Sequence, residues 1–413
     1  MSQNGRMVHG LRPEFRLLLL CAAPHSIAVP PEQVALLLGQ VSDWPFLFSA
    51  AGAHGIRMLF FRTLKAAGYP RVPDEWRQAC EHGLQTQAEE NLVFTVELAR
   101  LLGLLETRGI QAVPYKGPVL ALQAFGNLGL RDFGDLDILV RHRDIHSVVQ
   151  LMREDGYALQ LPEQSRYANG AQHAQVPGQY YFDRPPSFRP VEFHTEKTLR
   201  YYPVPLDLDR LQGRLVSIRL AGQSASTFCP EDALTVLSVH GSKHLWNRLQ
   251  WAADLAWLVR SNSEFSWDLA MLSAREFGAE RMTLSGLALA SELFVLDLPP
   301  DIAAQIKSDP VVTKLVAQAL TEMFAGEFAS AGIAQRAMFR VRSMGASSSG
   351  LRYLFRLMAS PTEEDWESAR GSRLRQMVMR PVRLIRKYGW GFSQRSAKTG
   401  AREAGDDPAH KVA

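Results

Sequence analysis

The chain has 413 residues, which is long enough for about two or three domains with an ample hydrophobic core. Hydrophobic residues make up 46% and charged residues 21% of the sequence, as in ordinary globular proteins, and the net charge of +4 is too small to indicate nucleic-acid binding by itself. The three cysteines lie far apart without metal-binding spacing, which argues against a disulfide framework and favours a reducing compartment.

The N-terminal part of the chain is predicted to be helical. Residues 1–12 are expected to be a disordered lead-in, and the apolar run 17–23 is too short to span a bilayer and is followed by no clear cleavage site. Helices are predicted from Pro31, over 44–67, and over 76–108, with Gly109 as a C-cap. This pattern indicates a layer of helices that shapes a substrate site, in a cytoplasmic protein without a transmembrane segment.

Residues 116–140 carry the pattern around which the chain is organised. Lys116-Gly117 follows a predicted strand over 111–115, and Pro118 opens a short apolar helix. Glycine lets a phosphate approach the backbone, and a helix N-terminus offers N–H groups to an anion. This segment therefore favours binding of a phosphate.

A strand over 134–140 is predicted to carry Asp135 and Asp137 on one face. Two carboxylates that share a face repel each other unless a cation neutralises them or water solvates them both. Oxygen ligands on a rigid strand suit Mg²⁺, which binds one or two carboxylates together with substrate phosphates. Arg131, just before them, is interpreted either as a bidentate partner of a triphosphate or as a surface partner of Asp132.

Further strands are predicted at 156–159, 179–182 and 189–194, after a helix over 143–155. In the last strand, Glu192 and His194 share a face. An acid and a histidine on one face fit a third metal ligand or a base, or a hydrogen-bonded pair without a further role.

From residue 228 onward the chain is again predicted to be mostly helical. One helix is expected to start at Cys229-Pro230 and to continue past Trp246, Trp251 and Trp257, which are interpreted as core residues. His240 and His244 are four residues apart, so they share a helical face, with Lys243 beside them. This pattern favours a phosphate-facing helix, with a zinc pair as the alternative, and Asp254 is expected to orient Lys243 or His244.

These motifs resemble known nucleotidyltransferases. The order of strand, glycine turn, helix, loop and Asp-x-Asp strand resembles the polymerase-beta-like nucleotidyltransferase fold. A closer resemblance, to the uncharacterised bacterial nucleotidyltransferase family, rests on the string KG…L…FG…LR…GDLDILV, on Glu192-x-His194 and on the His-Gly-x-Lys-His…Trp segment from His240. The resemblance covers residues from about 104 to 260.

The resemblance implies an α+β fold and a domain order. A nucleotidyltransferase core with a small mixed sheet is expected over 104–210, between a helical region over 1–103 and another over 211–395, with a disordered tail over 396–413. The implied activity is an EC 2.7.7-type transfer of a nucleoside monophosphate from an NTP such as ATP to a hydroxyl-bearing acceptor. The acceptor, in polysaccharide or modified-peptide biosynthesis, is expected to be a small molecule, sugar or peptide rather than a nucleic acid.

The resemblance also assigns roles to residues of the site. Two Mg²⁺ or Mn²⁺ ions are expected to bind a set of three acids. Nucleotide contacts are expected from a second set, which surrounds the acids. The acids are Asp135, Asp137 and Glu192, and the nucleotide-binding set is Lys116, Gly117, Arg131, His194, His240, Lys243 and His244.

Two other functions fit the same residues. A non-catalytic nucleotide-binding regulatory module would use the same pocket, although three carboxylates facing one site are costly without metal. An RNA-modifying toxin of the same superfamily would suit the basic stretch over 373–395, which contains no acid. That stretch is otherwise interpreted as a helix that packs through its apolar residues, or as a contact with an anionic surface.

Overall fold

The computed structural model describes residues 10–24, 29–160, 178–185, 190–196, 206–324, 333–345, 350, 351, 353 and 355. Residues 1–161 and 168–353 form one compact unit, to which the following description applies. The second unit comprises 162–167 and 354–413, of which only residue 355 is described. The basic stretch over 373–395, the predicted tail and most of the predicted lead-in therefore lie outside the described residues.

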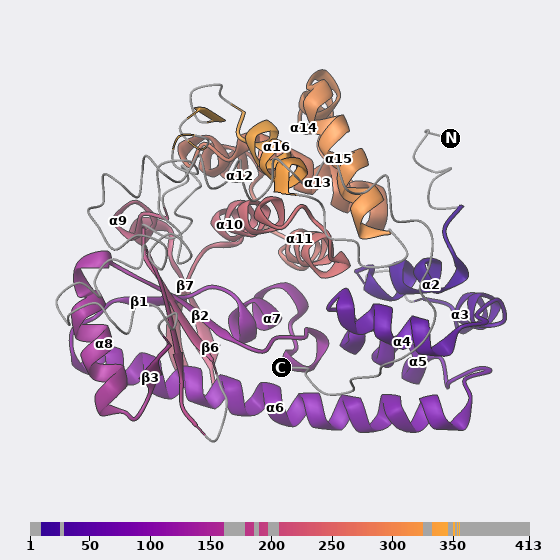
Figure 1. The fold of residues 1–413 in the computed structure, drawn as a ribbon, viewed down its shortest axis with the longest axis horizontal. Helices are drawn as coiled ribbons and strands as arrows, with labels where there is room; N and C mark the ends of the chain where they lie inside the picture. The colour runs from indigo at the N-terminus through magenta and orange to yellow at the C-terminus, as the bar shows by residue number, and fades with distance from the viewer. Residues whose placement is uncertain are drawn as a thin grey trace, which may run out of the picture. The chain divides into compact units, whose positions relative to one another are not determined.

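The architecture is α+β, as predicted, with a small mixed sheet between helices that precede and follow it in the chain (Figure 1). None of the described helices is long and apolar enough to cross a membrane. The helices before the sheet are α2 (Pro13–Ala22), α3 (Pro31–Leu38), α4 (Trp44–Ala53), α5 (Arg57–Ala66) and α6 (Asp74–Thr107).

The segment predicted as one helix over 44–67 forms two, α4 and α5. The chain turns at Gly55, whose φ of +66° lies in the left-handed region that favours glycine. A Cβ at this position would lie 2.5 Å from the side-chain oxygen of Gln250, so the turn is also a point of close packing between distant parts of the chain.

Helix α6 has 34 residues and runs beneath both α5 and the sheet (Figure 1). Leu98 and Leu101 are buried in the core, whereas Leu92 and Val96 on the same helix are 56% and 52% exposed. The buried stripe of the helix passes instead through a polar residue, Asn91. Its side-chain amide donates to the carbonyl oxygens of Leu128 and Arg131, which explains why a polar residue lies on the buried face.

The main sheet has five strands in the order β1-β2-β5-β4-β3. Strands β2 and β5 are parallel, and the other neighbouring pairs are antiparallel, which confirms the predicted mixed sheet. Strand β2 is buried along its whole length, as its apolar sequence predicts. The strands are β1 (Ala112–Pro114), β2 (Leu136–Val140), β3 (Ala158–Leu159), β4 (Gln179–Asp183) and β5 (Val191–His194); α7 (Gly117–Phe125) links β1 to β2, and α8 (Ile145–Glu154) precedes β3.

A hairpin that the sequence analysis did not predict follows the sheet. Strands β6 (Val216–Leu220) and β7 (Gln223–Thr227) pair antiparallel. They are joined by Ala221-Gly222, with φ of 47° and 86°, as a tight hairpin turn requires. Thr227 donates its hydroxyl to the carbonyl oxygen of Pro114, so the hairpin attaches to β1.

The C-terminal helices are α10 (Pro230–Lys243), α11 (Leu249–Ser261), α12 (Trp267–Glu276), α13 (Glu280–Phe294), α14 (Pro300–Ser308), α15 (Pro310–Met323) and α16 (Ile333–Ser343). The expected continuous helix from Pro230 onward is interrupted after α10, where Leu245 and Trp246 have φ of 58° and 54°. Trp246 is fully buried there, and a Cβ at Gly241 or Gly286 would lie within 2.7 Å of its ring. Two glycines therefore make room for the indole.

A buried polar network ties α6 to the end of α8 and the start of β3. Arg100 donates to both carboxylate oxygens of Glu97 at 2.9 and 2.7 Å and to Asp155 at 2.8 Å. Tyr157 donates its hydroxyl to Glu97 at 2.6 Å. The bonds from Arg100 and Tyr157 outweigh burial and lower the pKa of Glu97 to about 2.

We predict that Glu97 contributes stability above pH 4.5 that is lost as the pH falls toward 2. The ionised form is favoured in the folded protein, so the unfolded protein binds more protons in this range. Glu97→Gln should lower the free energy of unfolding at pH 7 by about 1–3 kcal/mol and flatten its pH dependence below pH 4.5, measured by urea denaturation. Glu81→Gln, which removes an exposed ion pair on the same helix, is the control and should change it by less than about 0.5 kcal/mol.

Candidate functional site

The pairing of β2 with β5 brings two acids together. Asp137 lies directly opposite Glu192 on the neighbouring parallel strand, so their side chains share one face of the sheet. His194, two residues after Glu192, lies on the same face. These three are the only group of ligand-type side chains among the described residues in which one ligand atom from each lies within 4.8 Å of the others.

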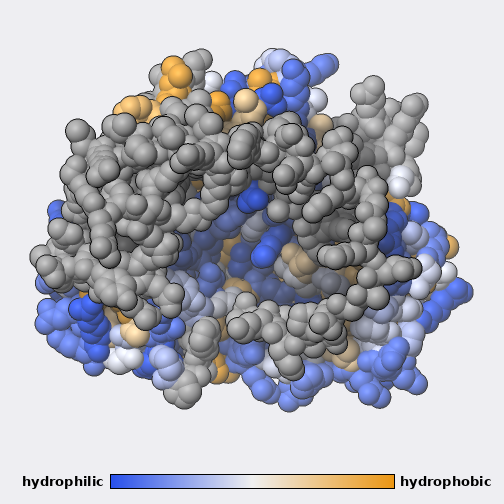
Figure 2. All heavy atoms as spheres, viewed as in Figure 1, coloured by the Kyte–Doolittle hydropathy of each residue, from blue (hydrophilic) through white to orange (hydrophobic). Residues whose placement is uncertain are grey.

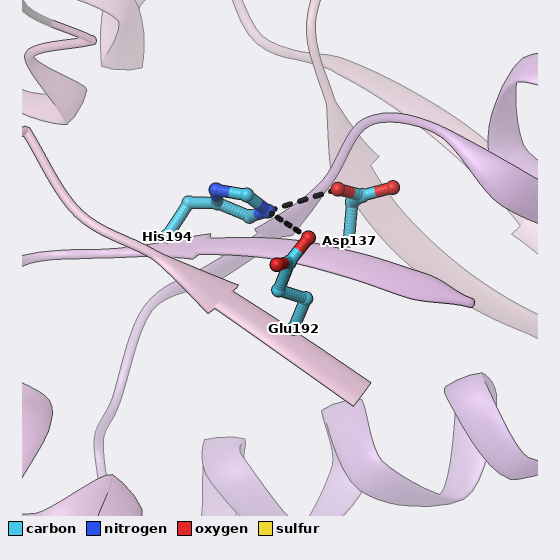
Figure 3. A group of neighbouring side chains, drawn as sticks. All are labelled: Asp137, Glu192 and His194. Atoms are coloured by element: carbon cyan, nitrogen blue, oxygen red, sulfur yellow. Dashed lines mark hydrogen bonds and ion pairs between the residues drawn. The ribbon is translucent and has the colours of Figure 1, made fainter. Parts of the chain in front are cut away.

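The three side chains point toward one another from their two strands (Figure 3). Nε2 of His194 lies 2.9 Å from Oδ1 of Asp137 and 3.3 Å from Oε2 of Glu192. Burial opposes charge on Asp137, yet Lys116 and His194 hold its pKa well below its usual range. Burial likewise disfavours a charged His194, but the two carboxylates raise its pKa. The site thus holds one buried acid, Asp137, and one half-buried acid, Glu192, each next to a neighbouring cation.

Lys116 is the second cation of the site, with Nζ 2.9 Å from Oδ1 of Asp137. It is the N-cap of α7, and Gly117 begins the helix with φ of +53°. A Cβ on Gly117 would lie 3.1 Å from the carbonyl oxygen of Asp135. The glycine is therefore required both by the backbone conformation and by the close approach of the loop that carries Asp135.

Asp135 lies just before β2 rather than within it and makes no hydrogen bond or ion pair with another described residue. Burial and the charge of Asp137 raise its pKa to about 6. The repulsion expected between the two aspartates is therefore present, and Lys116 only partly offsets it.

The donors suit a divalent cation. Asp137 and Glu192 offer oxygen ligands from a rigid sheet, as hard cations prefer. Nδ1 of His194 is buried without a hydrogen-bond partner among the described residues, and its Nε2 faces both acids, so the imidazole lies where positive charge is needed. A cation that binds between these acids would compete with His194 and Lys116 for the same oxygens.

Arg131 is buried and forms two hydrogen bonds of 2.9 Å with the carboxylate of Asp254 on α11. The predicted surface pair with Asp132 is therefore wrong, as is the prediction that Asp254 orients Lys243 or His244. Asp132 instead accepts from the backbone N–H of Arg57 at the start of α5. The loop before β2 is thus fixed to helices on both of its sides.

His240, Lys243 and His244 lie at the end of α10. The rings of His240 and His244 are 4.8 Å apart, and both contact the ring of Trp251. Burial and the charge of Lys243 lower the pKa of His244 to about 3. No acid or cysteine of the described chain joins the two histidines in a group of three ligands, so the zinc alternative gains no support.

Two cavities meet at these residues. The larger, of about 1330 Å³, is lined by Gly117, Arg131 and Asp137, and by residues of α6 such as Glu90 and Phe94. The smaller, of about 270 Å³, is lined by other residues of the predicted site, including Glu192, His194 and Lys243. Both cavities share Lys116, Asp135, His240 and His244 as lining residues. Figure 2 shows hydrophilic residues in a hollow near the centre of the viewed face.

Sequence reasoning missed several residues around these cavities. Arg340 on α16 donates to the carbonyl oxygen of Lys243 at 3.0 and 2.8 Å, and Gln179 on β4 donates to Glu192. Trp251, which was predicted to be core, is half-buried and lines the larger cavity, whereas Trp246 and Trp257 are core as predicted. Gln179 lies at the start of a predicted strand, but no local signal pairs it with Glu192, and none indicates Arg340.

A known protein family matches the part of the chain that contains this site. A sequence model of the family described as "Uncharacterised nucleotidyltransferase" matches residues 40–295, more than half of the chain. The chain belongs to this family. No curated protein matches it. Among solved structures, this nucleotidyltransferase family member is similar to an antigenic nucleotidyltransferase-like protein from Paracoccidioides brasiliensis, with 15% identity over 52% of this chain and 93% of that chain, and a TM-score of 0.30.

We predict that the buried pair of Arg131 and Asp254 is required for stability in this nucleotidyltransferase. Asp254→Asn leaves a buried guanidinium without its counter-charge and should lower the free energy of unfolding by about 3–5 kcal/mol in urea denaturation. The double variant Arg131→Met with Asp254→Leu removes both charges and should recover most of that loss. A loss below about 1 kcal/mol for Asp254→Asn would contradict the assignment.

Proposed function

We propose that the protein is a metal-dependent nucleotidyltransferase that moves a nucleoside monophosphate from an NTP such as ATP to a hydroxyl-bearing acceptor, as an EC 2.7.7-type enzyme. The observation that carries the proposal is the placement of Asp137 opposite Glu192, beside Asp135 and the glycine turn at Gly117. The core, within the polymerase-beta-like superfamily, comprises residues 104–210, between helical regions over 1–103 and 211–395. Its cytoplasmic location and bacterial origin are part of the same proposal.

The acids are proposed to hold the metal. Asp135, Asp137 and Glu192 would bind Mg²⁺ or Mn²⁺, because each offers carboxylate oxygens beside the two cavities. Bound ions of this kind neutralise charge on the attacking and leaving oxygens of a phosphoryl transfer. His194, which now neutralises the acids, would then orient Asp137 and Glu192 by hydrogen bonding.

The nucleotide is proposed to bind in the larger cavity. Gly117 lines it at the first turn of α7, where free N–H groups and the helix dipole favour phosphate. Lys116 and Arg131 add positive charge at the same cavity, and Arg131 is held in place by Asp254. His240 and His244 border this cavity as well, with the ring of Trp251 against them.

The chemical step requires few atoms of the protein. The acceptor hydroxyl oxygen forms a bond to the α-phosphorus, the bond from that phosphorus to the bridging oxygen of the β-phosphate breaks, and pyrophosphate leaves. The hydroxyl proton passes to a carboxylate of the acid cluster. The sequence pattern assigns Lys243 to a phosphate-facing helix, but Lys243 lines the smaller cavity and not the larger one, which favours a different role.

A regulatory nucleotide-binding module is the second candidate, and the buried acids count against it. Burial and the charge of Asp137 raise the pKa of Asp135, a cost that binding a metal would remove. The basic stretch that suggested a toxin lies outside the described residues and supports neither alternative.

We predict that Asp135→Asn separates catalysis from stability. Asp135 has no ion pair with another described residue to lose, so the free energy of unfolding should be unchanged or higher, while transfer should fall by at least about 100-fold through lost metal binding. Asp137→Asn should also abolish transfer but should lower stability, because it removes the partner of Lys116 and His194. Transfer is measured with the four α-labelled NTPs, Mg²⁺ or Mn²⁺, and a cell extract.

The exposed Asp301→Asn on α14 is the matched control and should behave as the wild type in both measurements. Wild-type transfer by the Asp135→Asn protein would sink the catalytic assignment. If Asp137→Asn proved as stable as the wild type, the contacts of Lys116 and His194 with this acid would contribute nothing to folding.

A further inference from the structure

The smaller cavity is lined by a lysine, Lys243, whose charge Glu192 and Asp137 only partly offset. Lys243 is half-buried, and within the described part of the chain no carboxylate forms an ion pair with it. Burial lowers its pKa, so the folded protein incurs a cost by placing a cation there. Its backbone is fixed, because Arg340 donates two hydrogen bonds to its carbonyl oxygen. A lysine that lines a cavity and forms no ion pair with another described residue suits an anionic ligand.

The size of the cavity limits what that ligand can be. About 270 Å³ is the space of roughly nine water molecules, which is too little for a nucleoside triphosphate. Part of its lining is apolar and includes Leu206, Val236 and Val239, all buried. The cavity therefore fits a compact molecule, and a polymer such as RNA or a folded protein would have no room inside it.

The two cavities are arranged as an in-line transfer requires. The attacking and leaving oxygens lie on opposite sides of the reacting phosphorus, so acceptor and pyrophosphate need separate spaces that meet at the acids. Gly117 faces only the larger cavity, and Glu192 faces only the smaller, while Lys116 and Asp135 line both. A hydroxyl group in the smaller cavity can therefore reach the acids beside Asp135 while phosphates lie against Gly117.

We propose that the smaller cavity is the acceptor subsite, and that it takes a small hydroxyl-bearing molecule with a phosphate or carboxylate group bound by Lys243. This inference rests on the proposed function and gives its acceptor a chemical class. Gln179 contributes by donating a hydrogen bond to Glu192, which holds that acid at the border of the cavity. The reaction is the one given above, with the acceptor hydroxyl losing its proton to a carboxylate of the cluster.

The test separates nucleotide binding from transfer. A cell extract is divided by ultrafiltration into small molecules and macromolecules, and transfer of label from each α-labelled NTP to each fraction is measured. Binding of the same NTPs is measured separately by equilibrium dialysis with Mg²⁺. We expect a labelled product, distinct from the NTP, to form with the small-molecule fraction. Treating that fraction with an anion-exchange resin before the reaction should remove the acceptor, so that no product forms.

Lys243→Gln should slow transfer by about 10–100-fold, the value of a charge-assisted contact, while NTP binding changes by less than about twofold. Val239→Phe, which fills the apolar part of the cavity, should likewise slow transfer and leave NTP binding nearly unchanged. The melting temperature of this variant checks that it is folded. Lys314→Gln, an exposed lysine on α15, is the matched control and should leave both measurements unchanged.

Three results would overturn the subsite. Label in the macromolecular fraction would exclude a small acceptor. An equal loss of NTP binding and transfer in Lys243→Gln would assign the lysine to the nucleotide's own phosphates, and unchanged transfer in that variant would leave the lysine without a role. Failure of the wild type to bind or transfer any NTP is a distinct outcome, which overturns the proposed function itself and the subsite with it.

Discussion

Asp137 and Glu192 lie opposite each other on adjacent parallel strands in the interior of the protein. Two neighbouring carboxylates in such a place cannot both be charged without nearby positive charge. Lys116 and His194 supply that charge, each within 2.9 Å of Asp137. His194 lies two residues after Glu192 on β5, so its contact with Asp137 is set by the register of β2 and β5. A shift of one residue between these strands would put Asp137 on one face of the sheet and both Glu192 and His194 on the other.

Several hydrogen bonds also fix the loop that leads into β2. Arg131 binds Asp254 of α11, Asn91 of α6 binds the backbone of the loop, and Asp132 accepts from the start of α5. Each of these partners belongs to a helix outside the sheet. The helical regions before and after the sheet therefore position Asp135 and also line the larger cavity. These contacts explain why the helices and the sheet form one compact unit.

Sequence reasoning succeeded where the signal was local. The alternation around Asp137, the glycine turn at Gly117 and the Glu192-x-His194 strand each lie within a few residues, and the structure contains all three elements. It failed where the partner was distant: Arg131 and Asp254 are 123 residues apart, and no periodicity relates them. The break after α10 could not be predicted from the sequence either. The backbone of Leu245 and Trp246 is left-handed, which is rare for residues other than glycine.

The indole of Trp246 occupies space that two absent side chains leave open, at Gly241 on its own helix and Gly286 on α13. Replacing either glycine with a larger residue would push the ring out of its position, and the turn that carries His244 toward the cavities would move with it. Replacing Trp246 with a smaller residue would instead leave a cavity between the helices. These three positions are therefore expected to covary among relatives, with a smaller residue at 246 wherever either glycine has acquired a side chain.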